Sequence, residues 1–229
     1  MNASSAREAW LNFTTWLSDT PLMHAGVSAS TTPHLNINNH KPPGLPTMID
    51  EQQVDPRSVY DLRGQPLTTV VDGDAQAGKM LHIFSSRRDA AAYVESHEAP
   101  INDQPRVRRS EIHSVSQALT AGPPPGQGFF EMYDNDNLGG CYWRILEWEG
   151  LTFNYSKKFA CGFLFWGWIS ADNRVSSIDS YISADHVFLW DFPNLAGSNL
   201  WIPTGAFRIN SLTAFGWNDR ISSQNVLYF

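Results

Sequence analysis

The chain has 229 residues, a formal net charge of −7 at pH 7 and only 16 lysine and arginine residues. This length suits one large domain or a compact domain with a long appendage. The scarcity of basic residues excludes a broad phosphate-binding surface, so we do not expect nucleic acid as a direct partner. The start of the chain has no basic region followed by an apolar run, and no apolar stretch reaches the roughly 18 to 20 residues of a membrane helix. We therefore expect neither a secretion signal nor a membrane span.

Residues 1–58 are predicted to form a short helix followed by a proline-rich extended arm. The helix is expected at residues 5–18, where apolar side chains recur at i, i+3 and i+7 on one face, namely Trp10, Phe13 and Leu17. From Pro21 to Asp55 no strand or helix period persists, and prolines interrupt any ladder. Such a segment cannot form a core alone, so we expect the apolar stripe to bind another protein chain or a second copy of this one.

Residues 59–121 are predicted to form a small α/β segment, a satellite to the rest of the chain. The expected order is strand, turn, strand and helix, at residues 67–71, 72–78, 79–84 and 86–95. Ser86 is the predicted N-cap of the helix, with Asp89 in its first turn. The sequence GPPPGQG at 122–128 has the composition of a linker, and we place a domain boundary there.

Residues 129–229 read as an all-β sandwich made of two similar halves. Seven of the nine tryptophans lie between Trp143 and Trp217, and short aromatic and β-branched runs are cut by Gly, Asn and Asp. YDNDNLGG at 133–140 and WDFPNLAG at 190–197 share one pattern: an aromatic, four residues, Leu, one residue, Gly. DNRVSS at 172–177 and NDRISS at 218–223 follow in the same order. A duplicated hairpin and a duplicated loop therefore predict a duplicated structural motif.

These paired patterns resemble the βγ-crystallin family, whose signature is a Tyr-x-x-x-x-Phe-x-Gly hairpin followed by an Asn/Asp-Asn/Asp-x-x-Ser/Thr-Ser string. Leu138 and Leu195 stand where an aromatic is usual, and the first half is longer than the second. The resemblance covers about 100 residues and is silent on residues 1–125. It implies two Greek-key motifs packed as a sandwich, so the predicted fold class is mainly β, with an N-terminal arm and a small α/β segment in front.

The same resemblance implies two calcium ions clamped between the two strings. The serine hydroxyls, the arginine main-chain carbonyls and the carbonyls after the hairpin aromatics would donate oxygens, and the second-slot Asn and Asp would reach across to the opposite loop. The implied set is Asp134, Asn173, Arg174, Ser176, Asp191, Asp219, Arg220 and Ser222. Hydroxyl, carboxylate and carbonyl oxygens suit Ca²⁺. Both arginine side chains are expected in solvent, where their charge would limit the affinity to micromolar or weaker.

An alternative needs no ion, because Asp, Asn and paired Ser are also ordinary turn residues that cap backbone amides. Cys141 and Cys161 are expected as free buried thiols, with a disulfide as the alternative and zinc disfavoured by the spacing. His24, His34 and His40 lie in the arm, where solvated or packing roles are expected. No catalytic motif is present in the sequence, so we expect a protein that is not an enzyme.

The sequence therefore predicts a non-enzymatic structural protein with a calcium-binding crystallin-like domain. Its arm would anchor it in a larger protein assembly, for example a virion or an injection apparatus, and it would be located in the cytoplasm or within such a particle. Two alternatives remain: a stand-alone calcium-binding stress or structural protein, and a secreted protease inhibitor or toxin of the same fold. The expected partners are other protein chains, with a homo-oligomer as one form.

Overall fold

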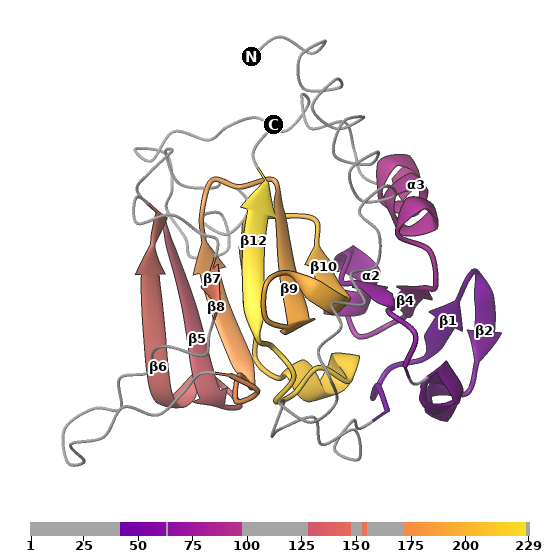
Figure 1. The fold of residues 1–229 in the computed structure, drawn as a ribbon, viewed down its shortest axis with the longest axis horizontal. Coiled ribbons are helices and arrows are strands. Elements are labelled where there is room, and N and C mark those ends of the chain that lie inside the picture. The colour runs from indigo at the N-terminus through magenta and orange to yellow at the C-terminus, as the bar shows by residue number, and fades with distance from the viewer. Residues whose placement is uncertain (1–41, 63, 98–127, 148–152, 155–171, 228–229) are drawn as a thin grey trace, which may run out of the picture.

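A computed structural model of the chain describes residues 42–62, 64–97, 128–147, 153–154 and 172–227. Within these ranges the fold is mainly β, as predicted, and its strands form one four-stranded and one eight-stranded sheet (Figure 1). No helix in the same ranges has the length and apolar character needed to cross a membrane. The predicted apolar stripe of Trp10, Phe13 and Leu17 lies outside the described residues.

The four-stranded sheet is antiparallel throughout, with the order β11-β8-β5-β6. Its strands are β5 (Phe129–Asn135), β6 (Gly139–Leu146), β8 (Ser177–Tyr181) and β11 (Ala206–Ile209). Alternate side chains face inward, because successive residues of a strand point to opposite faces. Phe130, Met132 and Ile178 are completely buried on the inner face.

The second half of the sandwich forms one end of the eight-stranded sheet, in the order β10-β9-β12-β7. Its strands are β7 (Phe153–Asn154), β9 (His186–Phe192), β10 (Ala196–Ile202) and β12 (Ser223–Leu227). Each half lends one strand to the other: β7 follows the first hairpin but pairs with β12, and β11 follows the second hairpin but pairs with β8. This exchange gives two Greek-key motifs packed as a sandwich, which confirms the predicted fold.

The core between the two sheets is apolar and continuous. Leu189 and Leu200 from the second half belong to the same buried cluster as Ile178 and Phe207 of the four-stranded sheet. Trp217 is buried in the same cluster, and its indole Nε1 donates to Thr69 Oγ1 at 3.2 Å. Because that threonine belongs to the α/β segment, the core of the sandwich extends toward residues 42–97.

The α/β segment has the predicted strand, strand and helix. The elements are β1 (Thr47–Ile49), β2 (Gln52–Val54), η2 (Pro56–Leu62), β3 (Thr68–Val70), α2 (Gly73–Gln76), β4 (Leu81–Phe84) and α3 (Arg87–His97). Ser86 Oγ accepts from Asp89 N at 3.4 Å at the start of α3, as the sequence indicated. The predicted turn at 72–78 contains α2, which Asp72 caps through a bond from Ala75 N.

The prediction of an unpaired arm through Asp55 is wrong for residues 47–54. There β1 pairs with β2 in a hairpin and with β4 in parallel. Strands of three residues are too short to display a period in the sequence, and the partner strand β4 lies in another segment of the chain.

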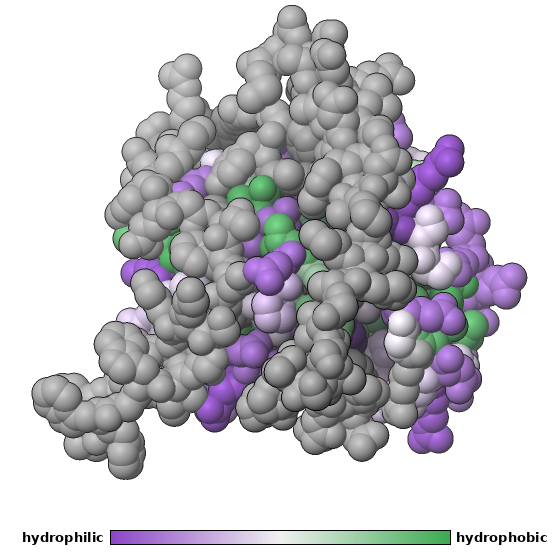
Figure 2. Space-filling view, viewed as in Figure 1, coloured by the Kyte–Doolittle hydropathy of each residue, from purple (hydrophilic) through white to green (hydrophobic). Residues whose placement is uncertain are grey.

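Figure 2 shows hydrophilic residues over much of the visible surface at the right-hand side, where residues 42–97 lie.

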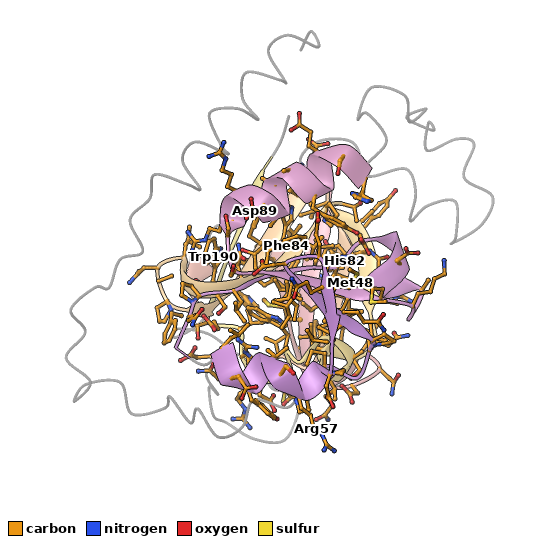
Figure 3. The ribbon with its side chains drawn as sticks, turned by 90° about the vertical axis from the view of Figure 1, so that its right-hand side faces the viewer. Met48, Arg57, His82, Phe84, Asp89 and Trp190 are labelled. Atoms are coloured by element: carbon orange, nitrogen blue, oxygen red, sulfur yellow. The ribbon has the colours of Figure 1, made fainter. Side chains whose placement is uncertain are left out.

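The α/β segment is joined to the sandwich and is not a satellite. Strand β3 pairs in parallel with β10, so β2, β1, β4 and β3 extend the sheet of the second Greek key. Helix α3 packs over the sheet where β3 pairs with β10 (Figure 3). Its Ala90, Ala91 and Val94 share one buried cluster with residues of both parts. We call this cluster the joint; its other buried members are Val70, Phe84, Phe188, Trp190 and Trp201. The pairing of β3 with β10 covers an edge that the sandwich would otherwise expose.

Candidate metal centre

The two loops that carry the repeated strings lie against each other with reciprocal hydrogen bonds. Asn173 N donates to Ile221 O at 3.0 Å, and Asp219 N donates to Val175 O at 3.1 Å. Asn173 and Asp219 both have a left-handed backbone, with φ of 56° and 58°. Asn and Asp tolerate this conformation better than other residues with a side chain. The second slot of each string therefore has a conformational reason to hold Asn or Asp, apart from any ligand.

Each loop is also fastened to the hairpin of its own half. Ser176 N donates to Tyr133 O at 2.8 Å, and Ser222 N donates to Trp190 O at 2.7 Å. The last serine of each string makes the matching side-chain contacts. Ser177 Oγ donates to Asn135 O and accepts from Leu138 N, and Ser223 does the same with Phe192 O and Leu195 N. The calcium-site resemblance assigned no role to these two serines, but the ion-free alternative expected paired serines to cap backbone amides, as both do here.

The two hairpins explain why both halves of the chain have the same spacing between aspartate and glycine. Asp134 Oδ1 accepts from Cys141 N at 2.7 Å, and Asp191 Oδ1 accepts from Ser198 N at 2.8 Å. The preceding glycines, Gly140 and Gly197, have φ of 79° and 82°, and an added Cβ would lie 2.0 and 2.1 Å from the respective carboxylate oxygens. Only glycine fits this turn, because both the conformation and the space exclude a side chain.

The first set of oxygens gathers at Ser176. Its hydroxyl donates to Asp134 O at 2.9 Å and lies 3.5 Å from Asp219 Oδ1 of the opposite loop. These spacings are close to those of adjacent ligands around Ca²⁺, which binds oxygens at about 2.3 to 2.6 Å. We call Asp134, Ser176 and Asp219 the first site, to which the resemblance would add the main-chain carbonyl of Arg174.

The second set is related to the first by the pseudo-twofold of the loops. Ser222 Oγ lies 3.5 Å from Asn173 Oδ1, so the side chain of the opposite loop again reaches across. We call Ser222 and Asn173 the second site, to which the resemblance would add the main-chain carbonyls of Asp191 and Arg220. Within the described residues, no group of three His, Cys, Asp or Glu side chains is arranged to hold a metal ion. Both sites consist mainly of hydroxyl, amide and carbonyl oxygens.

The two third-slot arginines differ, and the prediction that both side chains lie in solvent is wrong for Arg220. Arg174 is exposed. The Arg220 side chain is only 14% exposed; its Nη2 lies 3.0 Å from Asp191 Oδ2, and its Nη1 donates to Gly216 O at 3.1 Å. Its guanidinium also stacks 4.3 Å from the ring centroid of Trp217. The tryptophan face and the buried carboxylate hold Arg220 inward, since both attract a guanidinium.

Asp191 is consequently a buried carboxylate with two guanidinium groups around it. Burial raises the pKa of the Asp191 carboxyl, while Arg220 and the Ser198 amide oppose the rise. Arg87 of α3 donates to Gly197 O at 3.2 Å, and its guanidinium lies 4.8 Å from the ring centroid of Trp190. Burial lowers the pKa of Arg87, and the charge of Asp191 opposes this shift. The second site therefore stands beside fixed positive charge.

Cys141, in strand β6 of the first hairpin, is disulfide-bonded. The prediction of a free thiol is therefore wrong at this position. The sequence placed both cysteines in the aromatic-rich half, but it did not indicate which strands would bring a partner close enough for a bond.

The exchanged strands, the paired hairpins and the facing loops define a βγ-crystallin-like Greek-key domain at residues 128–227. No protein-family model and no curated protein matches the chain. Among solved structures, it is similar to one described under the evolution of the eye lens βγ-crystallin domain fold, with 21% identity, coverage of 47% of this chain and 91% of that one, and a TM-score of 0.34. A βγ-crystallin domain from Flavobacterium johnsoniae has 19% identity, coverage of 43% and 93%, and a TM-score of 0.32. Spherulin 3a from Physarum polycephalum has 21% identity, coverage of 47% and 89%, and a TM-score of 0.31.

Proposed function

We propose that this chain is a non-enzymatic structural protein whose crystallin-like domain binds Ca²⁺ and whose N-terminal arm anchors it in a larger protein assembly. The observation that carries the calcium proposal is the crossed arrangement of the two loops. Asp219 reaches Ser176 and Asn173 reaches Ser222, each across the contact between the loops. Turn chemistry alone would be satisfied by contacts within one loop.

The first site has the chemistry that Ca²⁺ requires. A carboxylate, a hydroxyl and a main-chain carbonyl come from three separate segments, and the Arg174 carbonyl would add a fourth protein oxygen. Water molecules would supply the remaining ligands, as is common for Ca²⁺. When bound, the ion would neutralise charge and link these segments, so its expected effect is on stability.

A structural role is supported by the way the described buried acids are used. Glu131 pairs with Arg144, and Asp179 pairs with Arg208 at 2.6 Å. Glu147 accepts from Gly128 N and from the Ser183 hydroxyl. Each of these carboxylates fastens neighbouring strands or strand ends, which is a structural use of a buried acid.

Thermal unfolding of the full chain in Ca²⁺ and in chelator tests the calcium proposal. Calcium at a hundred times its dissociation constant is expected to stabilise the fold by about 2.7 kcal/mol. Ser176→Ala should remove most of this gain, because it deletes the hydroxyl of the first site. Ser85→Ala, which removes an exposed hydroxyl that binds only Asp50, serves as the matched control. An unchanged melting temperature in millimolar Ca²⁺ would end the proposal.

The assembly role rests on the predicted apolar stripe of Trp10, Phe13 and Leu17 and on the proline-rich segment that follows it. Deleting residues 1–41 should leave folding and calcium binding intact and abolish incorporation into the parent assembly. A stand-alone crystallin-like protein would lose nothing by this deletion except the arm. Cosedimentation of the deleted and full chains with the parent particle separates these two functions.

A further inference from the structure

The two sites occupy equivalent positions but differ in the charge that the opposite loop supplies. The first site receives a carboxylate from Asp219, whose Oδ1 lies 3.5 Å from Ser176 Oγ. The second site receives a neutral amide from Asn173, whose Oδ1 lies 3.5 Å from Ser222 Oγ. Ligand charge is a main determinant of Ca²⁺ affinity in oxygen sites, so this exchange favours the first site.

The two arginines differ in a way that also favours cation binding at the first site. Arg174, at the first site, is exposed, and water screens its charge. Arg220, at the second site, is held by Asp191, Gly216 and Trp217, and its Nε is buried without a hydrogen-bond partner. A guanidinium fixed in a poorly screened environment repels a second cation more strongly than a solvated one does.

Arg220 also neutralises the carboxylate of Asp191, which would otherwise attract a cation to the second site. Asp191 Oδ2 is bound to Arg220, and Oδ1 is occupied by the Ser198 amide. Arg87 of α3 donates to Gly197 O at 3.2 Å, so a further positive group lies beside the second hairpin. The carboxylate is thus compensated by the protein itself and has little attraction left for a metal ion.

We propose that the chain binds one Ca²⁺, at the first site, and that Arg220 excludes an ion from the second site by supplying its positive charge internally. This inference rests on the proposed function, since it takes the ion to be Ca²⁺. It differs from the two ions that the family resemblance implies. Arg220 is the residue that decides which of two otherwise similar loops accepts a cation.

Calorimetric titration of the metal-free full chain with CaCl₂ alone tests the inference, with equilibrium dialysis as a second measure of stoichiometry. The wild type should bind one ion per chain. Ser176→Ala should bind none, whereas Ser222→Ala should bind one with an unchanged dissociation constant. Two ions in the wild type, or loss of the single ion in Ser222→Ala with retention in Ser176→Ala, would overturn the inference and leave the proposed calcium function standing. No ion in the wild type would refute both.

The role of Arg220 is tested by a matched pair of substitutions. Arg220→Gln should raise the stoichiometry from one to two, and Arg88→Gln, at an exposed arginine outside both sites, should leave it at one. A stoichiometry of one in Arg220→Gln would refute the assignment of exclusion to this side chain. If Arg220→Gln does not fold because Asp191 is left charged and buried, the double variant Asp191→Asn/Arg220→Gln removes both charges. One ion in that variant would refute the assignment equally.

Discussion

The joint between α3 and the second Greek key should make residues 42–97 and the sandwich unfold together. Val94 lies on the buried side of α3 and is 2% exposed. It shares the joint with Phe188, Trp190 and Trp201, which belong to the sandwich. Val94→Ala removes two methyl groups from this cluster. It leaves the charge unchanged and does not lower the helix propensity.

The size of the effect follows from the number of buried groups that are lost. Removal of one buried methyl group costs about 0.5 to 1.5 kcal/mol, so the two methyl groups of Val94 are worth roughly 1 to 3 kcal/mol. If the free energy of unfolding falls by about 2 kcal/mol per molar urea, the urea concentration at the unfolding midpoint should fall by about 0.5 to 1.5 M. This shift is large enough to resolve by equilibrium unfolding.

Tryptophan fluorescence and far-UV circular dichroism, followed in the same urea titration, provide the assay. Residues 42–97 contain no tryptophan, so the fluorescence reports on other parts of the chain, including Trp190 and Trp201. Both signals should move together in Val94→Ala, and the exposed control Glu95→Ala should stay within about 0.5 kcal/mol of the wild type. A fluorescence midpoint that does not move, with an earlier separate change in circular dichroism, would refute the claim that the two parts form one cooperative unit.

Three further predictions concern local features of the sandwich. Gly197→Ala should destabilise the fold by several kcal/mol more than Gly64→Ala in urea unfolding, because both have positive φ but only Gly197 has a carboxylate oxygen 2.1 Å from the added Cβ; equal losses would show that backbone strain alone matters. Ser177→Ala should cost about 1 to 3 kcal/mol by the same assay, because the Leu138 amide loses its acceptor, and a neutral result would contradict that role. Burial lowers the pKa of His186 to about 3, whereas the unfolded value is about 6.5. The unfolded chain therefore binds the extra proton between these values, and the free energy of unfolding should fall as pH drops from about 6.5 toward 3, by up to about 1.4 kcal/mol per pH unit. His186→Gln should lessen this loss, and an identical pH profile would exclude His186 as its source.

The local elements and the duplication could be predicted from the sequence. Ser86 and Asp89 identified the start of α3, and the repeated hairpin and serine strings identified two equivalent halves. These signals are local, because a cap, a left-handed turn or a hairpin is determined by a few neighbouring residues. For the same reason, the residue types in the repeated strings were enough to predict which oxygen atoms the candidate site contains.

The sequence by itself therefore determined the motifs, their order and their donor atoms. Only the tertiary structure decided which segments pair and which charged side chains lie beside each site. Nothing local in Thr68–Val70 reveals that it will pair with β10, since that contact joins segments far apart in the chain. Arg174 and Arg220 are the same residue in the same slot, yet one is exposed and the other is held against Trp217 and Asp191. A side chain with a long flexible stem takes its position from the partners that packing places within reach, and those partners exist only once the fold has formed.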